Sequence, residues 1–410
     1  MSLHHYLRKL VNGPVVWRYL DAFAPRIFGL IFHSFILHRF GGPGYALPAW
    51  IFGIFNLILG PIPDPHGFIL VRGHGDRARR LLSLATPYLL AKTLLAVIVT
   101  VLCVPFLVSS SLIEAQAGNL ILLTLGATIY SATEALWGVL GTVSLALGNV
   151  RRVAIAAVGT RLLGLGILLV LDQLPQISVS FYILGYTLPL MLSCILFFPF
   201  QLNISRIILF ANYAIRRYGL WSQGISLTTM ALAQLAPISM GMFDGVSAQQ
   251  VGQIAYINRL LLAALVPLQV LQSVVIHGYS RGEGAVSTHY RKIFKFSGVA
   301  LFGFGGYQIW HFSVTGRIEP RAALATTLIL LGVAISCWFR FEISVILAST
   351  RIRELLVRGY LPVLAGAVIL TYPAGKFFGV VGLGALTLAA WCGISISWMW
   401  ISTQPQRRPS

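Results

Sequence analysis

The chain has 410 residues, of which 57% are hydrophobic and 10% are charged, and its mean hydropathy is +0.81. A soluble globule needs more polar residues than this to face water, so the composition excludes that class and predicts a polytopic membrane protein. The net charge of +19 would suit a nucleic-acid-binding protein, and the positions of the basic residues along the chain decide against that interpretation.

Apolar segments recur along the whole chain, and each is about as long as a helix needs to cross the hydrocarbon core of a bilayer. We therefore expect an all-α integral membrane protein of about 12 transmembrane helices, in two six-helix bundles around a central cavity. No removable signal peptide is expected, because no cleavage-site pattern follows the charged N-terminal segment MSLHHYLRKL. The predicted spans are residues 15–37, 44–62, 82–108, 118–147, 152–171, 177–200, 220–243, 250–277, 293–313, 320–349, 357–376 and 379–402.

The basic residues are distributed asymmetrically over the connections between these spans. Of the 30 basic residues, four fall in predicted outside loops and six inside spans, and the remaining 20 lie in the segments on the side of the N-terminus. This bias places both termini in the cytoplasm and explains most of the net charge as membrane topology. We therefore expect no nucleic-acid partner.

The middle of the chain separates the two predicted halves. A segment there interleaves apolar residues with Arg206, Arg216 and Arg217, which is typical of a helix lying on the cytoplasmic surface of the membrane. Two halves of six spans are typical of transporters, although no residue-level repeat relates them. The predicted domains are an N-terminal bundle (1–200), a linker helix (201–219), a C-terminal bundle (220–402) and a cytoplasmic tail (403–410).

The first predicted span contains three charged residues. Arg18 and Asp21 are three residues apart, so they share a helical face and can form an ion pair. Arg18 could instead reach the cytoplasmic headgroups, because it is close to that end of the span. Arg26 lies about halfway along the span and has no acidic residue on its face. We expect Arg26 to line a watery cavity, and Arg18 with Asp21 to gate or shape it.

Further charges lie in later spans, so that six basic groups face three acidic ones within the membrane. This excess predicts a cavity of positive potential. Arginine binds phosphate oxygens bidentately, so the expected guest is a phosphate or pyrophosphate group. Lys92 and Arg161 are nearer to span ends, and snorkelling is the alternative for both. The basic residues are Arg18, Arg26, Lys92, Arg161, Arg259 and Arg340, and the acidic ones are Asp21, Glu134 and Glu342.

Several polar and aromatic side chains could line a hydrophilic path beside these charges. Asn258, Gln269 and Gln272 accompany Arg259, and hydrogen bonds between helices are the alternative explanation for them. Tryptophan rings could stack on sugar faces, although tryptophan is also expected at bilayer interfaces. The residues of the predicted path are Trp137, Trp221, Tyr256, Asn258, Gln269 and Gln272.

Catalytic and metal-binding motifs are missing from the sequence. There is no HExxH, no Walker A loop and no pair of carboxylates at catalytic spacing, and no two of the four cysteines have metal-ligand spacing. We therefore expect a transporter rather than an enzyme, with no cofactor and no metal. Glu134 and Glu342 are candidates for coupling to a proton or sodium gradient, because a buried carboxylate readily holds a proton. Structural pairing with an arginine explains them equally well.

Three segments resemble a known family. They are ILHRFGGPGYALPAWIFGIFNLI, the passage MFDGVSAQQVGQIAYINRLLLAALVPLQVLQSVVIHGYSR with Gly252, Tyr256 and Arg259, and VVGLGALTLAAW near the end of the chain. They are similar to the Wzx-type oligosaccharide flippases of the multidrug/oligosaccharidyl-lipid/polysaccharide exporter superfamily. The likeness is coarse over the twelve spans and specific over about sixty residues.

This resemblance implies a protein of the bacterial inner membrane whose two bundles alternate between inward and outward states. The implied substrate is an undecaprenyl-diphosphate-linked oligosaccharide, moved from the cytoplasmic to the periplasmic leaflet for polysaccharide biosynthesis. Arg26 and Arg259 fall where flippases of the superfamily hold arginines that face the substrate. Membrane lipids, a polysaccharide polymerase and chain-length machinery are the implied partners.

Three alternatives remain. The loop RGHGDRARRLL (72–82) resembles that of major facilitator transporters, but Arg72 and Arg79 break the spacing. A cation-coupled multidrug exporter of the same superfamily would favour acidic over basic groups in its cavity. A membrane glycan polymerase or ligase would need a large periplasmic loop, whereas the longest predicted outside loops are 109–118 and 314–320.

Overall fold

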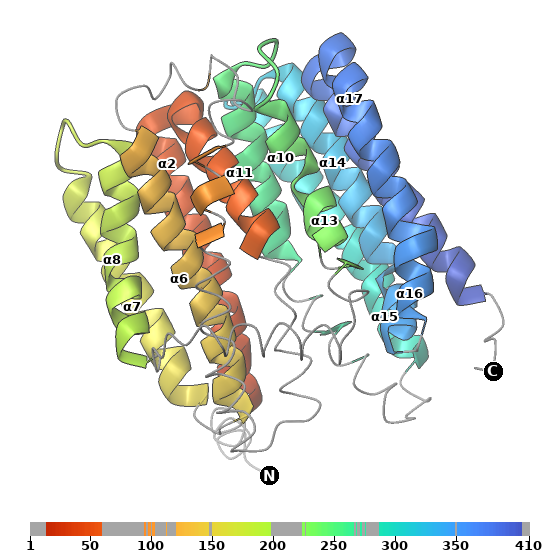
Figure 1. Ribbon diagram of the computed structural model, residues 1–410, viewed down its shortest axis with the longest axis horizontal. Coiled ribbons are helices and arrows are strands. Elements are labelled where there is room, and N and C mark those ends of the chain that lie inside the picture. The colour runs from red at the N-terminus through yellow and green to blue at the C-terminus, as the bar shows by residue number, and fades with distance from the viewer. Residues whose placement is uncertain are drawn as a thin grey trace. The chain divides into compact units, whose positions relative to one another are not determined.

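The computed structural model describes a helical protein. The described residues are 14–59, 94–95, 97–99, 101–102, 112, 120–146, 150–197, 224–225, 227–265, 268, 271–272, 275, 287–348 and 351–403. Within these ranges all regular secondary structure is helical (Figure 1), which confirms the predicted all-α class. The predicted linker 201–219 lies outside them.

The chain divides into two compact units, and the main boundary falls between Gln223 and Gly224. The described helices of the first unit are α2 (Pro14–Leu59), α6 (Leu120–Ala146), α7 (Val150–Leu171) and α8 (Val179–Phe197). Those of the second unit are α10 (Leu235–Met240), α11 (Ala248–Ala264), α13 (Ser287–Val314), α14 (Pro320–Trp338), α15 (Arg340–Ala348), α16 (Ile352–Glu354), the π-helix η2 (Leu355–Tyr360) and α17 (Leu361–Thr403).

Two of the long helices are interrupted by a glycine. In α2, Gly41 has φ 68° and ψ −178°, and in α17, Gly379 has φ 56° and ψ −139°. A positive φ is readily available only to glycine, so each residue ends one helical segment and lets the next begin. Gly41 lies between the predicted spans 15–37 and 44–62, and Gly379 lies where the span 379–402 was expected to begin.

Helix packing in the first unit joins α8 to α6 and α7, and α2 to the same two helices. Phe32 and Trp50 of α2, with Tyr182 and Tyr186 of α8, are fully buried in its core. In the second unit α14 packs against α13 and α17. A Cβ on Gly384 would lie 2.8 Å from the backbone of Ala325, so the small residue lets α17 approach α14 closely.

Several buried threonine and serine hydroxyls in these apolar helices donate to a carbonyl of their own helix. Thr128 donates to the Thr124 carbonyl at 2.6 Å, and Thr187 donates to the Ile183 carbonyl at 2.6 Å. Ser395 in α17 does the same with the Trp391 carbonyl at 2.8 Å. Such i−4 bonds let Ser and Thr lie in an apolar span without an unpaired donor.

Five helices of the described part are long and apolar enough to cross a membrane. They are Leu120–Trp137, Arg151–Leu171, Val179–Leu196, Pro320–Trp338 and the stretch Ile352–Thr403 that contains the break at Gly379. A multi-pass membrane protein follows from them, and the total of about 12 helices stays a prediction.

Candidate functional site

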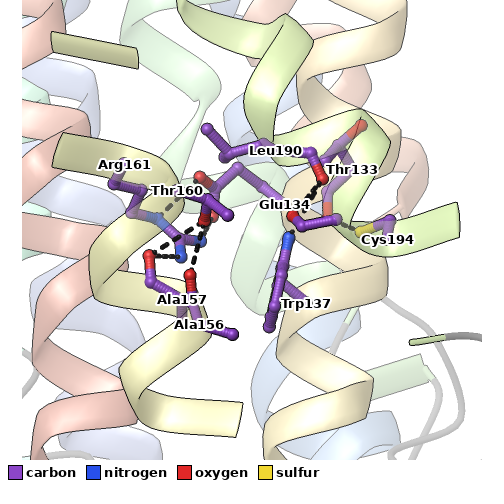
Figure 2. Close-up of polar contacts among 10 residues, drawn as sticks. Thr133, Glu134, Trp137, Ala156, Ala157, Thr160, Arg161, Leu190 and Cys194 are labelled. Carbon is purple, nitrogen blue, oxygen red and sulfur yellow. Dashed lines mark hydrogen bonds and ion pairs between the residues drawn. The ribbon is translucent and has the colours of Figure 1, made fainter. Parts of the chain in front are cut away.

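A buried ion pair joins α6 to α7 in the first unit (Figure 2). Arg161 donates from Nη2 to Oε2 of Glu134 at 2.7 Å and from Nε to Oε1 at 3.3 Å. Its Nη1 donates to the Ala157 carbonyl one turn earlier at 2.9 Å. The Arg161 side chain is fully buried, and 19% of the Glu134 side chain is exposed. The bidentate geometry and the extra carbonyl meet the conditions under which a buried charge is tolerated.

The position of Arg161 decides between two explanations left open by the sequence. A snorkelling arginine would keep its guanidinium in the headgroup region, whereas this one has no exposed surface. The sequence left two explanations for Glu134, ion coupling and structural pairing with an arginine. The structure shows such a pairing, with Arg161. Arg161 stays a predicted substrate ligand, but the structure already assigns bonds to all three of its nitrogens.

Trp137 lies one turn after Glu134 and extends this cluster to α8. Its ring lies 5.8 Å from the guanidinium carbon of Arg161, and its Nε1 donates to the Leu190 carbonyl at 3.3 Å. On the same helix pair, Cys194 donates through Sγ to the Thr133 carbonyl at 3.9 Å (Figure 2). Because Trp137 is only 2% exposed, its ring packs between helices here, and stacking on a sugar stays a prediction.

A cluster of aromatic rings occupies the core of the same unit and was not anticipated from the sequence. Phe32 of α2 stacks on Tyr186 of α8 with the ring centroids 4.3 Å apart, and it lies 5.1 Å from Tyr130 of α6. His33 lies among these rings, 5.3 Å from Phe52 and only 2% exposed. The sequence signal that could have indicated this cluster was His33 inside the apolar run IFHSF. Burying a polar ring in such a run costs free energy unless its surroundings compensate for it.

A second buried carboxylate lies in the other unit, at the start of α15. Glu342 accepts through Oε1 from Nη2 of Arg291 at 2.7 Å and from Nε at 3.0 Å. The Glu342 side chain is 7% exposed and that of Arg291 is 53% exposed. Arg291 precedes the predicted span 293–313, and α13, which begins at Ser287, already includes it.

Arg340 lies where α14 gives way to α15, just after Phe339. Its Nε donates to Oε1 of Gln272 at 2.9 Å, so two residues predicted for the site are brought together. No carboxylate in the described part of the chain forms an ion pair with Arg340.

The polar residues of α11 form hydrogen bonds to neighbouring segments. Asn258 donates through Nδ2 to the Ala233 carbonyl at 3.2 Å. At the start of the helix, Ser247 and Gln250 form a capping box, and Nε2 of Gln250 donates to Glu319 at 2.7 Å. The alternative explanation for Asn258 was a hydrogen bond between helical segments, and it makes such a bond. Its place on a polar path stays a prediction.

The remaining predicted site residues are described only in part. Arg26 is exposed on α2, whereas Tyr256 and Arg259 are half-buried on α11. Among the residues that the structure describes, no three His, Cys, Asp or Glu side chains gather as a metal site would require. The side chains of Arg18 and Asp21, and the residues Lys92, Trp221 and Gln269, lie outside the described part.

Comparison with solved structures identifies the fold. An inward closed structure of the lipid II flippase MurJ matches with a TM-score of 0.64 and 15% identity, over 95% of this chain and 88% of that one. An outward-facing MATE family transporter of the MOP superfamily matches with a TM-score of 0.53 and 14% identity, over 96% and 94%. A MATE structure in complex with MaL6 gives 0.51 and 15%, over 96% and 98%. This chain has the fold that these proteins share.

Sequence comparisons add nothing to this likeness. No family model matches the chain, and no curated protein matches it. The shared fold agrees with the predicted superfamily and with a multi-pass transporter-like architecture. The narrower Wzx-type assignment stays a prediction, because at 14–15% identity the likeness shows the fold alone.

Proposed function

We propose that this protein is a flippase that moves an undecaprenyl-diphosphate-linked oligosaccharide from the cytoplasmic to the periplasmic leaflet of a bacterial inner membrane. The observation that carries the proposal is the fold shared with the lipid II flippase MurJ over 95% of the chain. Two bundles that open alternately would let a polar glycan cross without contacting hydrocarbon. A polysaccharide polymerase and its chain-length machinery would act on the product.

The distribution of charge supports an anionic guest. Glu134 and Glu342 are each bonded to an arginine, so neither carboxylate presents an uncompensated negative charge to a diphosphate. Arg340 is bonded to a neutral amide, and its planar fork suits phosphate oxygens. Arg340 is therefore the described residue to which we assign diphosphate binding, with Arg26 and Arg259 as further candidates.

We assign coupling to an ion gradient to Glu342 rather than to Glu134. Both oxygens of Glu134 accept bonds from a buried arginine. In Glu342 only Oε1 is bonded to Arg291, while the buried Oε2 has no hydrogen-bond partner among the described residues. An oxygen of this kind is where a proton or a sodium ion would bind, and binding would weaken the hold on Arg291.

The test is mass spectrometry of polyprenyl-linked glycans after the protein is depleted in its host. We expect one complete, unpolymerised lipid-diphosphate-oligosaccharide to accumulate, and its mass would identify the glycan. Re-expression of Arg340→Ala should fail to clear this pool, and Arg340→Lys should clear part of it because the charge remains. Arg321→Ala removes an exposed arginine at the start of α14 and is the matched control, which should clear the pool fully. An unchanged glycan pool after depletion would refute the flippase.

A multidrug exporter is the second candidate, because two MATE structures share the fold with TM-scores of 0.53 and 0.51. A multidrug exporter predicts a different result when the protein is depleted. Depletion would sensitise the host to cationic drugs and leave the polyprenyl-linked pool unchanged.

A further inference from the structure

A shallow, open apolar slot runs between α13 and α14 on the surface of the second unit. Its volume is about 360 Å³, and its walls include Val299 and Phe302 on one helix and Ile335 and Trp338 on the other. These residues recur at helical spacing, so they form one continuous stripe on each helix. Val299 is 57% exposed and Phe302 is 40% exposed. An open apolar groove beside α14, a helix apolar enough to cross a membrane, suits a lipid chain.

One end of this slot carries positive charge. Nζ of Lys295 lies 5.1 Å from the centre of the Trp338 ring, which closes that end. Lys292 is exposed one turn earlier on the same helical face. Arg291 is next to it, but its charge is largely balanced by Glu342. The two lysines therefore supply the net charge beside the slot.

Trp338 lies at one end of a candidate membrane span. It is the last residue of Pro320–Trp338, one of the segments apolar enough to span a bilayer. Tryptophan and lysine at the end of a span lie at the level of the headgroups, while the rest of the slot extends toward the bilayer centre. Basic pockets between membrane helices bind anionic lipid headgroups.

We propose that the slot between α13 and α14 binds an anionic phospholipid of the bilayer, with an acyl chain along Val299 and Ile335 and the headgroup phosphate on Lys295 and Lys292. The lysines provide charge complementarity that a zwitterionic lipid would not satisfy. This lipid is distinct from a transported substrate, so the proposal does not rest on the flippase assignment.

The experiment is native mass spectrometry of the full chain released from vesicles of phosphatidylcholine and phosphatidylglycerol. We expect phosphatidylglycerol to be retained selectively. Lys295→Gln should lower its retention about fivefold, as expected for the loss of one lysine near a charged headgroup. Lys376→Gln is the matched control, because Lys376 makes a similar ring contact, 5.4 Å from Tyr372 on α17. Its retention should not change.

A second pair of variants separates a built site from general surface charge. Val299→Trp or Ile335→Trp would fill the slot from either wall and leave both lysines in place. Each should lower phosphatidylglycerol retention as strongly as Lys295→Gln, in protein whose thermal midpoint matches the parent. Unchanged retention in a folded slot-filling variant would reduce the effect to surface charge and overturn the proposal. Equal retention of phosphatidylcholine and phosphatidylglycerol by the parent chain would also overturn it.

Discussion

The ion pairs Arg161–Glu134 and Arg291–Glu342 have the same shortest N–O distance, 2.7 Å, but differ in which partner is buried. In the first unit the arginine has no exposed surface and the carboxylate is 19% exposed. In the second the carboxylate is 7% exposed and the arginine 53%. Arginine does not lose its proton in proteins, whereas a carboxylate can be neutralised by gaining one. In the first pair the buried partner is therefore the permanently charged group, and in the second it is the carboxylate.

The largest effect expected is from Glu134→Leu. It leaves the fully buried Arg161 without a carboxylate, and removal of one partner of a buried pair costs about 3–5 kcal/mol. Arg161→Met should cost less, because Glu134 is partly exposed and can be hydrated. The free energy of unfolding, measured by SDS titration in mixed micelles, checks both. Equal losses in the two variants would contradict the assigned asymmetry.

The second unit should show the reverse order. Arg291→Met leaves the buried Glu342 without its partner, and we expect a loss of about 1–3 kcal/mol. Glu342→Leu leaves an arginine that is more than half exposed and can remain hydrated, so its loss should be below about 1 kcal/mol. The same titration applies to both variants. If Glu342→Leu proved the more damaging, this pair would resemble the first one and would not suit a coupling role.

An exposed pair should give the smallest effect of the single substitutions. Arg358 in η2 bonds Glu354 one turn earlier at 3.1 Å, and its side chain is 57% exposed. Such i,i+4 pairs contribute about 0.3–0.5 kcal/mol. Arg358→Ala should therefore change the free energy of unfolding by no more than that. A loss above about 1 kcal/mol would mean that the side chain stabilises the π-helix in another way.

The smallest effect on stability is expected when both members of the first pair are replaced together. Glu134→Leu with Arg161→Met removes both charges at similar volume, and such replacements of buried pairs are often neutral or stabilising. If these internal bonds are the whole role of Arg161, export of the lipid-linked glycan should persist, because all three of its side-chain nitrogens donate to Glu134 or Ala157. A stable double variant that no longer clears the glycan pool would instead place Arg161 in the substrate path.

The sequence by itself determined the class of the protein, and its predicted span boundaries fall at or near the breaks at Gly41 and Gly379. Span length and apolar composition are local properties, so an all-helical membrane fold follows from them. The breaks at Gly41 and Gly379 are equally local, because only glycine readily adopts their positive φ. The sequence also identified Glu134, Arg161, Arg340 and Glu342 as charges that need an explanation.

Only the tertiary structure decided which group each of those charges contacts. Arg161 and Glu134 are 27 residues apart, and Arg291 and Glu342 are 51 apart. Their pairing depends on how each helix is rotated about its axis and where it crosses its neighbours, which no local pattern specifies. The same holds for the slot between α13 and α14, whose two walls lie on different helices. Composition fixed the number of charges within the spans, and helix packing determined which of them are neutralised.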